Sequence, residues 1–307
     1  MDLRPKALPF EPGSLPGLSE KLLRSHHQNN YQGAVERLNA IRAQLAGLDY
    51  GLAPRFQINA LKQEELVATN SMLLHALYFG SMGGAGAAMA PGMTLALEAN
   101  FGSVEHWRTE FVAMGKALAG GSGWVLLVFQ PRDGRLVHQR SAEHSQAVAG
   151  GVPILALAMD EHAYHIDFGA AAGDYVDAFM GHIHWAAVYE RYQAAVHGAG
   201  DALGATQDAV ARAAVVVDVR RAGVYEQSST TLPGARWLNP ATVDQWAGEL
   251  PTDQAVLVYC VYGHEVSRAT ALRLQAAGIQ AHFLLGGIDA WARAGRPLTS
   301  KNTSFCT

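Results

Sequence analysis

The chain of 307 residues is long enough for two domains with separate hydrophobic cores. With 49% hydrophobic and 16% charged residues, its composition is that of an ordinary soluble globular protein. A formal net charge of -4 argues against nucleic-acid or anionic-membrane binding, and no apolar run is long enough to span a bilayer. A count of two cysteines argues against a disulfide framework, so we expect a cytoplasmic protein.

The first part of the chain is predicted to be helical. Ser19 is a suitable N-cap because its hydroxyl can accept a bond from an early helical N–H, and Leu18 and Leu23 are spaced as a hydrophobic staple. His26 follows on the apolar face of this helix. The next expected elements are a helix over about 63–79, a loop of small residues over 83–93, and a helix from Ser103.

A small antiparallel sheet is expected after this helical region. The runs 124–129 and 135–139 flank the turn residues 131–134 and predict a hairpin, and residues 152–157 predict a third strand. A final helix is expected over about 175–194. Helices followed by a small sheet indicate an α+β domain.

The pattern changes again beyond residue 213. Strands are expected over 215–219, 256–260 and 282–285, and they alternate with helices around 240–248, 267–277 and 288–294. Such alternation predicts an α/β parallel sheet with both faces covered. The predicted organisation is a first domain over 1–197 (helical hairpin 1–90, α/β part 91–197), a linker over 198–213, a second domain over 214–300 and a tail over 301–307.

Histidines are concentrated in the first domain, and only His264 and His282 lie beyond residue 200. His26, His75 and His162 each lie among apolar residues at the ends of different predicted elements. One such histidine is more often a core residue than a ligand. Three of them favour a metal site, because imidazole is a common ligand of iron, manganese and zinc.

Cys260 ends a predicted buried strand and precedes a loop and a helix. Ligands of parallel sheets bind at such strand ends, where loop amides and a helix N-terminus can hold an anion and favour a thiolate. A reactive cysteine is therefore favoured over a structural one, whereas Cys306 is expected to be a spectator in the tail rather than a resolving thiol. The predicted sulfur-binding loop consists of Val261, Tyr262, Gly263, His264, Glu265 and Val266.

Four ordered motifs in this second part resemble a rhodanese (sulfurtransferase) domain: Asp218-Val219-Arg220, Leu232-Pro233-Gly234-Ala235, Cys260-x-x-Gly263 and GGxxAWxxAGxP over 286–297. The resemblance implies that Cys260 carries a persulfide, taking sulfur from a donor and passing it to a thiol or a cyanide-like acceptor. Asp218 and Arg220 are expected to form a buried framework ion pair. A Cys-x5-Arg phosphatase is disfavoured because position 266 is Val266. Since the loop has no Lys or Arg, we expect weak use of thiosulfate.

The first part resembles the iron/manganese superoxide dismutase family over about residues 8–195. The motifs, in chain order, are Leu8-Pro9-Phe10, His26-His27, Leu38-Asn39, His75-x-x-Tyr78-Phe79, Gly121-Ser122-Gly123-Trp124 and Glu161-His162-Ala163-Tyr164. The resemblance implies a metal held by His26, His75 and His162, iron or manganese as that metal, and superoxide as substrate. It also implies a homodimer through this domain, with Glu161 reaching across the interface.

The surroundings of the implied site depart from the family pattern. The family motif is Asp-x-Trp-Glu-His, but Ala158 stands at the aspartate and Asp160 at the aromatic position. Asp160 and His144 are therefore the alternative candidates for a fourth ligand. The implied neighbours of the metal ligands are Glu161, His144, Trp124, Tyr78 and His165.

Two hypotheses follow. The first is a bifunctional enzyme that combines a superoxide dismutase-like metal domain with a sulfurtransferase. The second is a degenerate metal-binding or dimerisation module, holding zinc or no metal, that carries a sulfurtransferase or persulfide-sensing domain. Three histidines plus one further ligand would suit tetrahedral zinc.

Overall fold

The computed structural model describes residues 2–84, 87–147 and 149–301. Two compact units make up the chain: one comprises Met1–Met89, Arg108–Val128 and His138–Val188, and the other Ala90–Trp107, Phe129–Val137 and Tyr189–Thr307. No helix among the described residues is long and apolar enough to cross a membrane. Cys306 lies outside the described residues.

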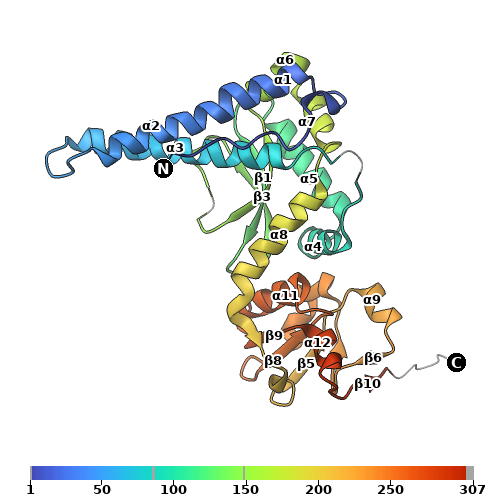
Figure 1. Ribbon diagram of the computed structural model, residues 1–307. Helices are drawn as coiled ribbons and strands as arrows, with labels where there is room; N and C mark the ends of the chain where they lie inside the picture. Colours follow the sequence, from blue (N-terminus) through green and yellow to red (C-terminus); the bar gives the residue numbers. More distant parts are fainter. Residues whose placement is uncertain (1, 85–86, 148, 302–307) are drawn as a thin grey trace. The chain divides into compact units, whose positions relative to one another are not determined.

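The N-terminal helices form a long antiparallel pair (Figure 1). The 3-10 turn η1 (Pro12–Ser14) leads to α1 (Glu20–Ser25), which continues through the π-helix η2 (His26–Gln32) into α2 (Gly33–Ala46). As predicted, the Ser19 hydroxyl caps α1 by accepting a hydrogen bond from the Leu22 N–H. The partner helix α3 (Arg55–Gly80) starts eight residues before the predicted position and packs on α2 through an apolar cluster. That cluster comprises Leu38, Ile41, Leu45 and Ala68.

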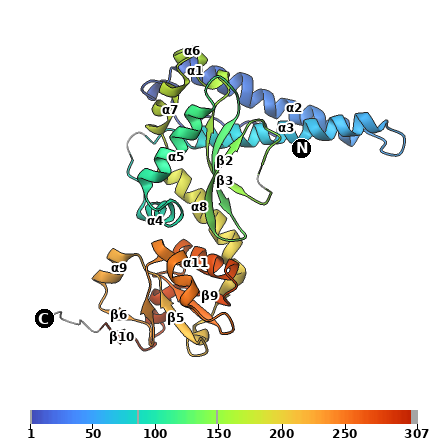
Figure 2. The same ribbon diagram turned by 180° about the vertical axis from the view of Figure 1, so that it is seen from behind.

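A three-stranded sheet follows two further helices. Its strands are β1 (Trp124–Gln130), β2 (Arg135–Ser141) and β3 (Val152–Ala158), and β1 lies between the other two. Figure 2 shows the sheet from behind. This confirms the α+β prediction of helices followed by a small antiparallel sheet. The helices of this part are α4 (Pro91–Phe101), α5 (Val104–Ala117), η3 (Glu161–Ala163), α6 (His165–Phe168), α7 (Ala172–Met180) and α8 (Trp185–Gly200).

Two predictions for this part were wrong in detail. The predicted loop over 83–93 ends early, because Pro91 occupies the first turn of α4, where its missing N–H costs nothing. The predicted single helix over 175–194 is two helices, because α7 ends at Met180 and α8 begins at Trp185. The His184 N–H donates to the Ser81 carbonyl at 2.7 Å, and Ile183 bridges to Met82. This long-range pairing breaks the helix, and local sequence does not reveal it.

The C-terminal sheet has five parallel strands in the order β4-β9-β8-β5-β7. One face packs on the cluster that includes Val217, Val258 and Phe283, and the other on the cluster that includes Leu257 and Trp291. The predicted α/β sheet is thus confirmed. The strands are β4 (Gly204–Ala205), β5 (Val215–Asp218), β7 (Arg236–Trp237), β8 (Val256–Tyr259) and β9 (Ala281–Leu284).

The predicted linker over 198–213 contains part of this sheet. Within it, β4 pairs with β9, with Gly204 opposite Phe283, so the sheet begins before residue 214. A two-residue edge strand carries too little pattern to be recognised from sequence. The remaining elements are η4 (Asp201–Leu203), η5 (Gln207–Ala209), α9 (Ala222–Gln227), β6 (Thr230–Thr231), η6 (Pro240–Thr242), α10 (Val243–Trp246), η7 (Ala247–Glu249), α11 (Glu265–Ala276), α12 (Gly287–Arg293) and β10 (Thr299–Ser300).

Candidate functional site

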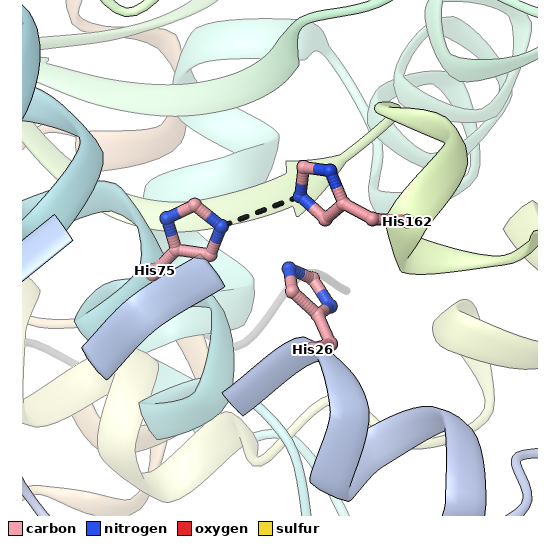
Figure 3. A group of neighbouring side chains, drawn as sticks. All are labelled: His26, His75 and His162. Carbon is pink, nitrogen blue, oxygen red and sulfur yellow. Dashed lines mark hydrogen bonds between the residues drawn. The ribbon is translucent and has the colours of Figure 1, made fainter. Parts of the chain in front are cut away.

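Three histidines from distant parts of the chain meet in the first unit (Figure 3). His26 is the first residue of η2, His75 lies near the end of α3, and His162 lies in η3, just after β3. One ring nitrogen from each lies within 4.8 Å of the others. A π-helical turn is rare and often marks a functional position, and here it starts at His26.

The hydrogen bond of His75 fixes which of its nitrogens carries the proton. Its Nδ1 lies 2.7 Å from the Ser71 carbonyl, which can only accept, so Nδ1–H is the donor. The other nitrogen, Nε2, then presents a lone pair and lies 3.5 Å from the His162 Nε2. Nitrogens that share one cation at about 2.1 Å in tetrahedral geometry lie roughly 3.4 Å apart. This pair of nitrogens therefore fits a shared metal ion.

The His26 ring has no hydrogen-bond partner in the part of the chain that the structure describes. Both of its ring nitrogens are buried without a hydrogen bond. Its centroid lies 4.7 Å from that of His162 and 5.0 Å from that of His75. A buried, unpaired polar nitrogen is costly unless another group binds it. A metal ion between the three rings would satisfy one nitrogen of His26.

Burial keeps all three imidazoles neutral at pH 7. Desolvation, with smaller contributions from the neighbouring histidines, holds the pKa of His26 well below its usual range. Burial lowers the pKa of His75 to about 3 and that of His162 to about 4. Because only a neutral imidazole can offer a lone pair to a metal, this environment favours ligation.

Three of the predicted neighbours line the histidine cluster. Trp124 packs edge-on against His75 with centroids 5.1 Å apart, and the Tyr78 ring lies 5.1 Å from that of His26. His144 stacks on His75 at 5.8 Å, and its Nε2 is buried without a partner among the described residues. The Tyr78 oxygen accepts a 3.1 Å hydrogen bond from Tyr175, a contact that sequence reasoning missed because Tyr175 lies in the distant α7.

In the second unit, Cys260 directly follows β8 and is nearly buried, with 6% of its surface exposed. Helix α11 begins at Glu265, two residues before the predicted start, so Glu265 and Val266 belong to its first turn rather than to the loop. Tyr262 and His264 are exposed, whereas Gly263 is buried. The backbone N–H groups of 261–267 donate to no backbone carbonyl within the described ranges, which leaves them available to an anion.

Glycines allow the strand ends to pack closely around Cys260. A Cβ atom at Gly287 would lie 2.5 Å from the Cys260 carbonyl and 2.4 Å from that of Val261, so only glycine fits. The Ile288 N–H donates to the Cys260 carbonyl at 3.1 Å. The glycine pair at the start of α12 therefore holds the loop in place.

Comparison with known proteins shows to which family the N-terminal part of the chain is related. The family model described as "Iron/manganese superoxide dismutases, C-terminal domain" matches residues 90–191. A protein named superoxide dismutase [Fe] from Cupriavidus metallidurans is 59% identical over 191 residues, 62% of this chain and 96% of that protein. The chain belongs to the iron/manganese superoxide dismutase family. The predicted resemblance is thereby confirmed.

More distant relatives include both metal types. A superoxide dismutase [Mn] of Haloarcula marismortui is 34% identical over 198 residues, covering 62% of this chain and 93% of that protein. A superoxide dismutase [Fe] of Aquifex pyrophilus is 30% identical over 197 residues, covering 61% and 90%. The rest of the chain matches the model described as "Rhodanese-like domain" over residues 202–294. A dismutase-family domain is thus fused to a rhodanese-like domain.

The dismutase-family domain brings no carboxylate into its histidine cluster, which among the described residues comprises His26, His75 and His162. Ala158 is fully buried at the end of β3 and offers only a methyl group. Asp160 lies beyond it, with a buried Oδ2 that has no partner in the described chain, and burial raises its pKa to about 6. Glu161 and His165, also predicted near the site, are exposed in the single chain.

The rhodanese-like domain contains the predicted buried ion pair. Arg220 donates to both carboxylate oxygens of Asp218, from Nε at 2.9 Å to each, and the Tyr259 hydroxyl donates to Asp218 at 2.8 Å. These residues lie at the carboxyl ends of β5 and β8, so they hold the strands that position Cys260. The buried ion pair expected of Asp218 and Arg220 is therefore present, with side-chain exposures of 0% and 3%.

Two side chains beside Cys260 were missed from sequence. Arg268 supplies a cation near the loop, but its Nε donates to the Gly263 carbonyl at 3.0 Å and its guanidinium covers the Phe283 ring. It therefore holds the loop through the Gly263 carbonyl. The second is Ser267, whose Oγ lies 3.2 Å from the Cys260 Sγ. No motif of the resemblance includes Ser267, and only the early start of α11 directs it toward the sulfur.

Proposed function

We propose that the dismutase-family domain binds iron or manganese through His26, His75 and His162 and converts superoxide to oxygen and hydrogen peroxide. The observation that supports this most directly is the convergence of three neutral imidazoles, two of them buried and that of His162 half-buried, whose nitrogens lie within 4.8 Å of one another. When bound, the metal would supply a one-electron couple between its +3 and +2 states. The relatives named for iron and manganese dismutases support the same pair of metals.

The surrounding residues orient the ligands and keep water out. The Ser71 carbonyl holds the His75 ring in the tautomer that presents Nε2, and such backbone bonds commonly orient ligating histidines. Trp124 and Tyr78 cover the rings with apolar surface. His144 keeps one buried nitrogen free beside His75, where it can hold a proton or complete the ligand set. Asp160 is the alternative fourth ligand, because it too has a buried atom without a described partner.

A second function is favoured by the alanine at position 158. A set of neutral imidazoles without a carboxylate stabilises a +3 metal less well than the family's set does, and three nitrogens with one further ligand suit zinc. The domain would then be a zinc-binding or metal-free dimerisation module that carries the rhodanese-like domain. Metal identity separates this alternative from the dismutase function.

The proposal for the rhodanese-like domain is sulfur transfer through a Cys260 persulfide. The Cys260 thiolate would attack a sulfane sulfur, forming an S–S bond while the donor leaves with the electron pair. A thiol or cyanide-like acceptor would then take the outer sulfur and return Cys260 to the thiolate. The N–H groups of 261–267, which donate to no backbone carbonyl among the described residues, support this function because they can stabilise the anionic terminal sulfur. With Arg268 directed to a loop carbonyl, we expect donors other than thiosulfate to be preferred.

The proposal also includes a cytoplasmic homodimer formed through the dismutase-family domain. Glu161 is exposed one residue from His162, so it is free to reach the metal site of a second copy. Sedimentation of the purified protein, with Glu161→Ala as the variant, would test this arrangement.

Metal analysis combined with a superoxide assay tests the first function. Protein produced with iron, manganese or zinc in excess should retain iron or manganese and remove superoxide far faster than the same amount of free metal. Background activity in a fully iron- or manganese-loaded sample would contradict the dismutase function, and selective zinc retention would favour the alternative. In Ala158→Asp/Asp160→Trp, activity should rise if the missing carboxylate limits it.

A further inference from the structure

Ser267 lies in the first turn of α11 and contacts the reacting sulfur directly. Its side chain is fully buried, and its Oγ lies 3.2 Å from the Cys260 Sγ. The same hydroxyl lies 3.4 Å from the His264 carbonyl, to which it can donate. The sulfur and the carbonyl therefore both lie within reach of the single hydroxyl proton.

The number of protons dictates how these bonds change when Cys260 ionises. With a protonated thiol, the S–H donates to the Ser267 oxygen, and the Ser267 O–H donates to the His264 carbonyl. With a thiolate, Sγ can only accept, so the Ser267 O–H must turn to the sulfur to form a hydrogen bond. The His264 carbonyl is not left unpaired, because it also accepts from the Arg268 N–H at 3.2 Å. The exchange of hydrogen bonds thus leaves no buried polar group without a partner.

We propose that Ser267 is a hydroxyl switch that stabilises the thiolate of Cys260. A hydrogen bond to a charged acceptor is stronger than one between neutral groups, and burial strengthens it further. The inference rests on the proposed sulfur transfer, in which Cys260 is a thiolate before sulfur is taken up and again after it is released. Ser267 acts on the second step in particular, because the S–S bond breaks with its electron pair going to Sγ.

Thr270 provides a matched control one turn further along α11. It is also buried, and its Oγ1 donates to the Val266 carbonyl within the helix at 2.8 Å rather than to the sulfur. Thr270→Val therefore removes a buried hydroxyl from the same helix without touching Cys260. Ser267→Ala removes the proposed switch, and Ser267→Thr retains a hydroxyl donor.

The test measures the rate of Cys260 alkylation by iodoacetamide against pH, in the full chain with Cys306→Ser so that one thiol reacts. In Ser267→Ala, the midpoint of the rate profile should rise by about one pH unit, a roughly tenfold loss of thiolate below the midpoint. Ser267→Thr and Thr270→Val should keep the midpoint of the parent. Circular dichroism would check folding, and Ser267→Val, which has the shape of the threonine variant but no hydroxyl, would replace an alanine variant that does not fold.

The outcomes separate this inference from the function on which it rests. An unchanged midpoint in Ser267→Ala, or an equal shift in Thr270→Val, would overturn the switch whatever the protein transfers. Failure of the parent to transfer sulfur would instead reject the sulfurtransferase function, while the alkylation profile still reports on Ser267. If both hold, Ser267→Ala should also slow release of sulfur to the acceptor by roughly tenfold.

Discussion

The two candidate sites of this chain are built in opposite ways. The cysteine site is local, because Cys260, its loop and Ser267 lie within eight consecutive residues at one strand end. The histidine site is assembled from residues 26, 75 and 162, which lie on three separate elements. A local site is positioned by its own strand–loop–helix unit, whereas a dispersed site depends on the packing of the whole domain. The two sites should therefore respond differently to the same kind of change.

The largest effect expected is the separation of the two functions. Cys260→Ser should abolish sulfur transfer and leave the bound metal unchanged. His75→Ala should reduce metal affinity by roughly 100-fold or more, because it removes one of three protein ligands, and leave sulfur transfer unchanged. Elemental analysis and a sulfur-transfer assay on both variants provide the measurement. Loss of sulfur transfer in His75→Ala would show that the sites are coupled, and persistent transfer in Cys260→Ser would reject the persulfide.

The next effect concerns the framework that supports the cysteine site. Asp218→Asn removes the charge that pairs with the buried Arg220, so we expect the rhodanese-like domain to lose about 3–5 kcal/mol of unfolding free energy. Chemical denaturation followed by tryptophan fluorescence would measure it, because Trp237, Trp246 and Trp291 all lie in this domain. The ion pair of half-buried Asp289 with exposed Arg293 offers a control, since Asp289→Asn should cost less than about 1 kcal/mol. Equal losses in both variants would contradict a framework role for Asp218.

The same contrast explains what could be predicted from sequence. The cysteine loop is contiguous with the strand before it and the helix after it, so strand pattern, turn glycines and the Cys260 position sufficed to place it. The proximity of the three histidines came from the family resemblance, because no periodicity relates His26 to His162. Even so, the predicted start of α11 was two residues late. With that start, Ser267 would be the first residue of the helix, and its contact with the Cys260 sulfur could not be foreseen.

The errors of prediction arose where long-range contacts override local preference. The break between α7 and α8 depends on a pairing of residues 183 and 184 with the end of α3, a hundred residues earlier. The contact of Tyr175 with Tyr78 likewise joins two helices that are distant in sequence. In contrast, the Ser19 cap was predicted correctly because its hydrogen bond spans only three residues.

The smallest expected effect is a pH dependence of folding stability that comes from the histidine site and not from the cysteine site. The pKa of His75 is lowered to about 3, whereas an unfolded histidine titrates near 6.5. Below about pH 6.5 the unfolded chain therefore binds a proton that the folded chain does not, so stability falls as the pH falls toward about 3. At pH 5 this difference amounts to about 2 kcal/mol for His75. Asp160, whose pKa is raised to about 6, acts in the opposite direction over the same interval.

A comparison of variants isolates the histidine contribution. Metal-free protein and His75→Gln would be unfolded with urea at pH 7 and at pH 5. The parent should lose about 2 kcal/mol more between these values than the variant does, because glutamine does not titrate while Asp160 and the other histidines are common to both. Equal losses would mean that His75 is protonated in the folded, metal-free protein. The His75 Nε2 would then carry a proton and could not offer a lone pair to a metal without first losing it.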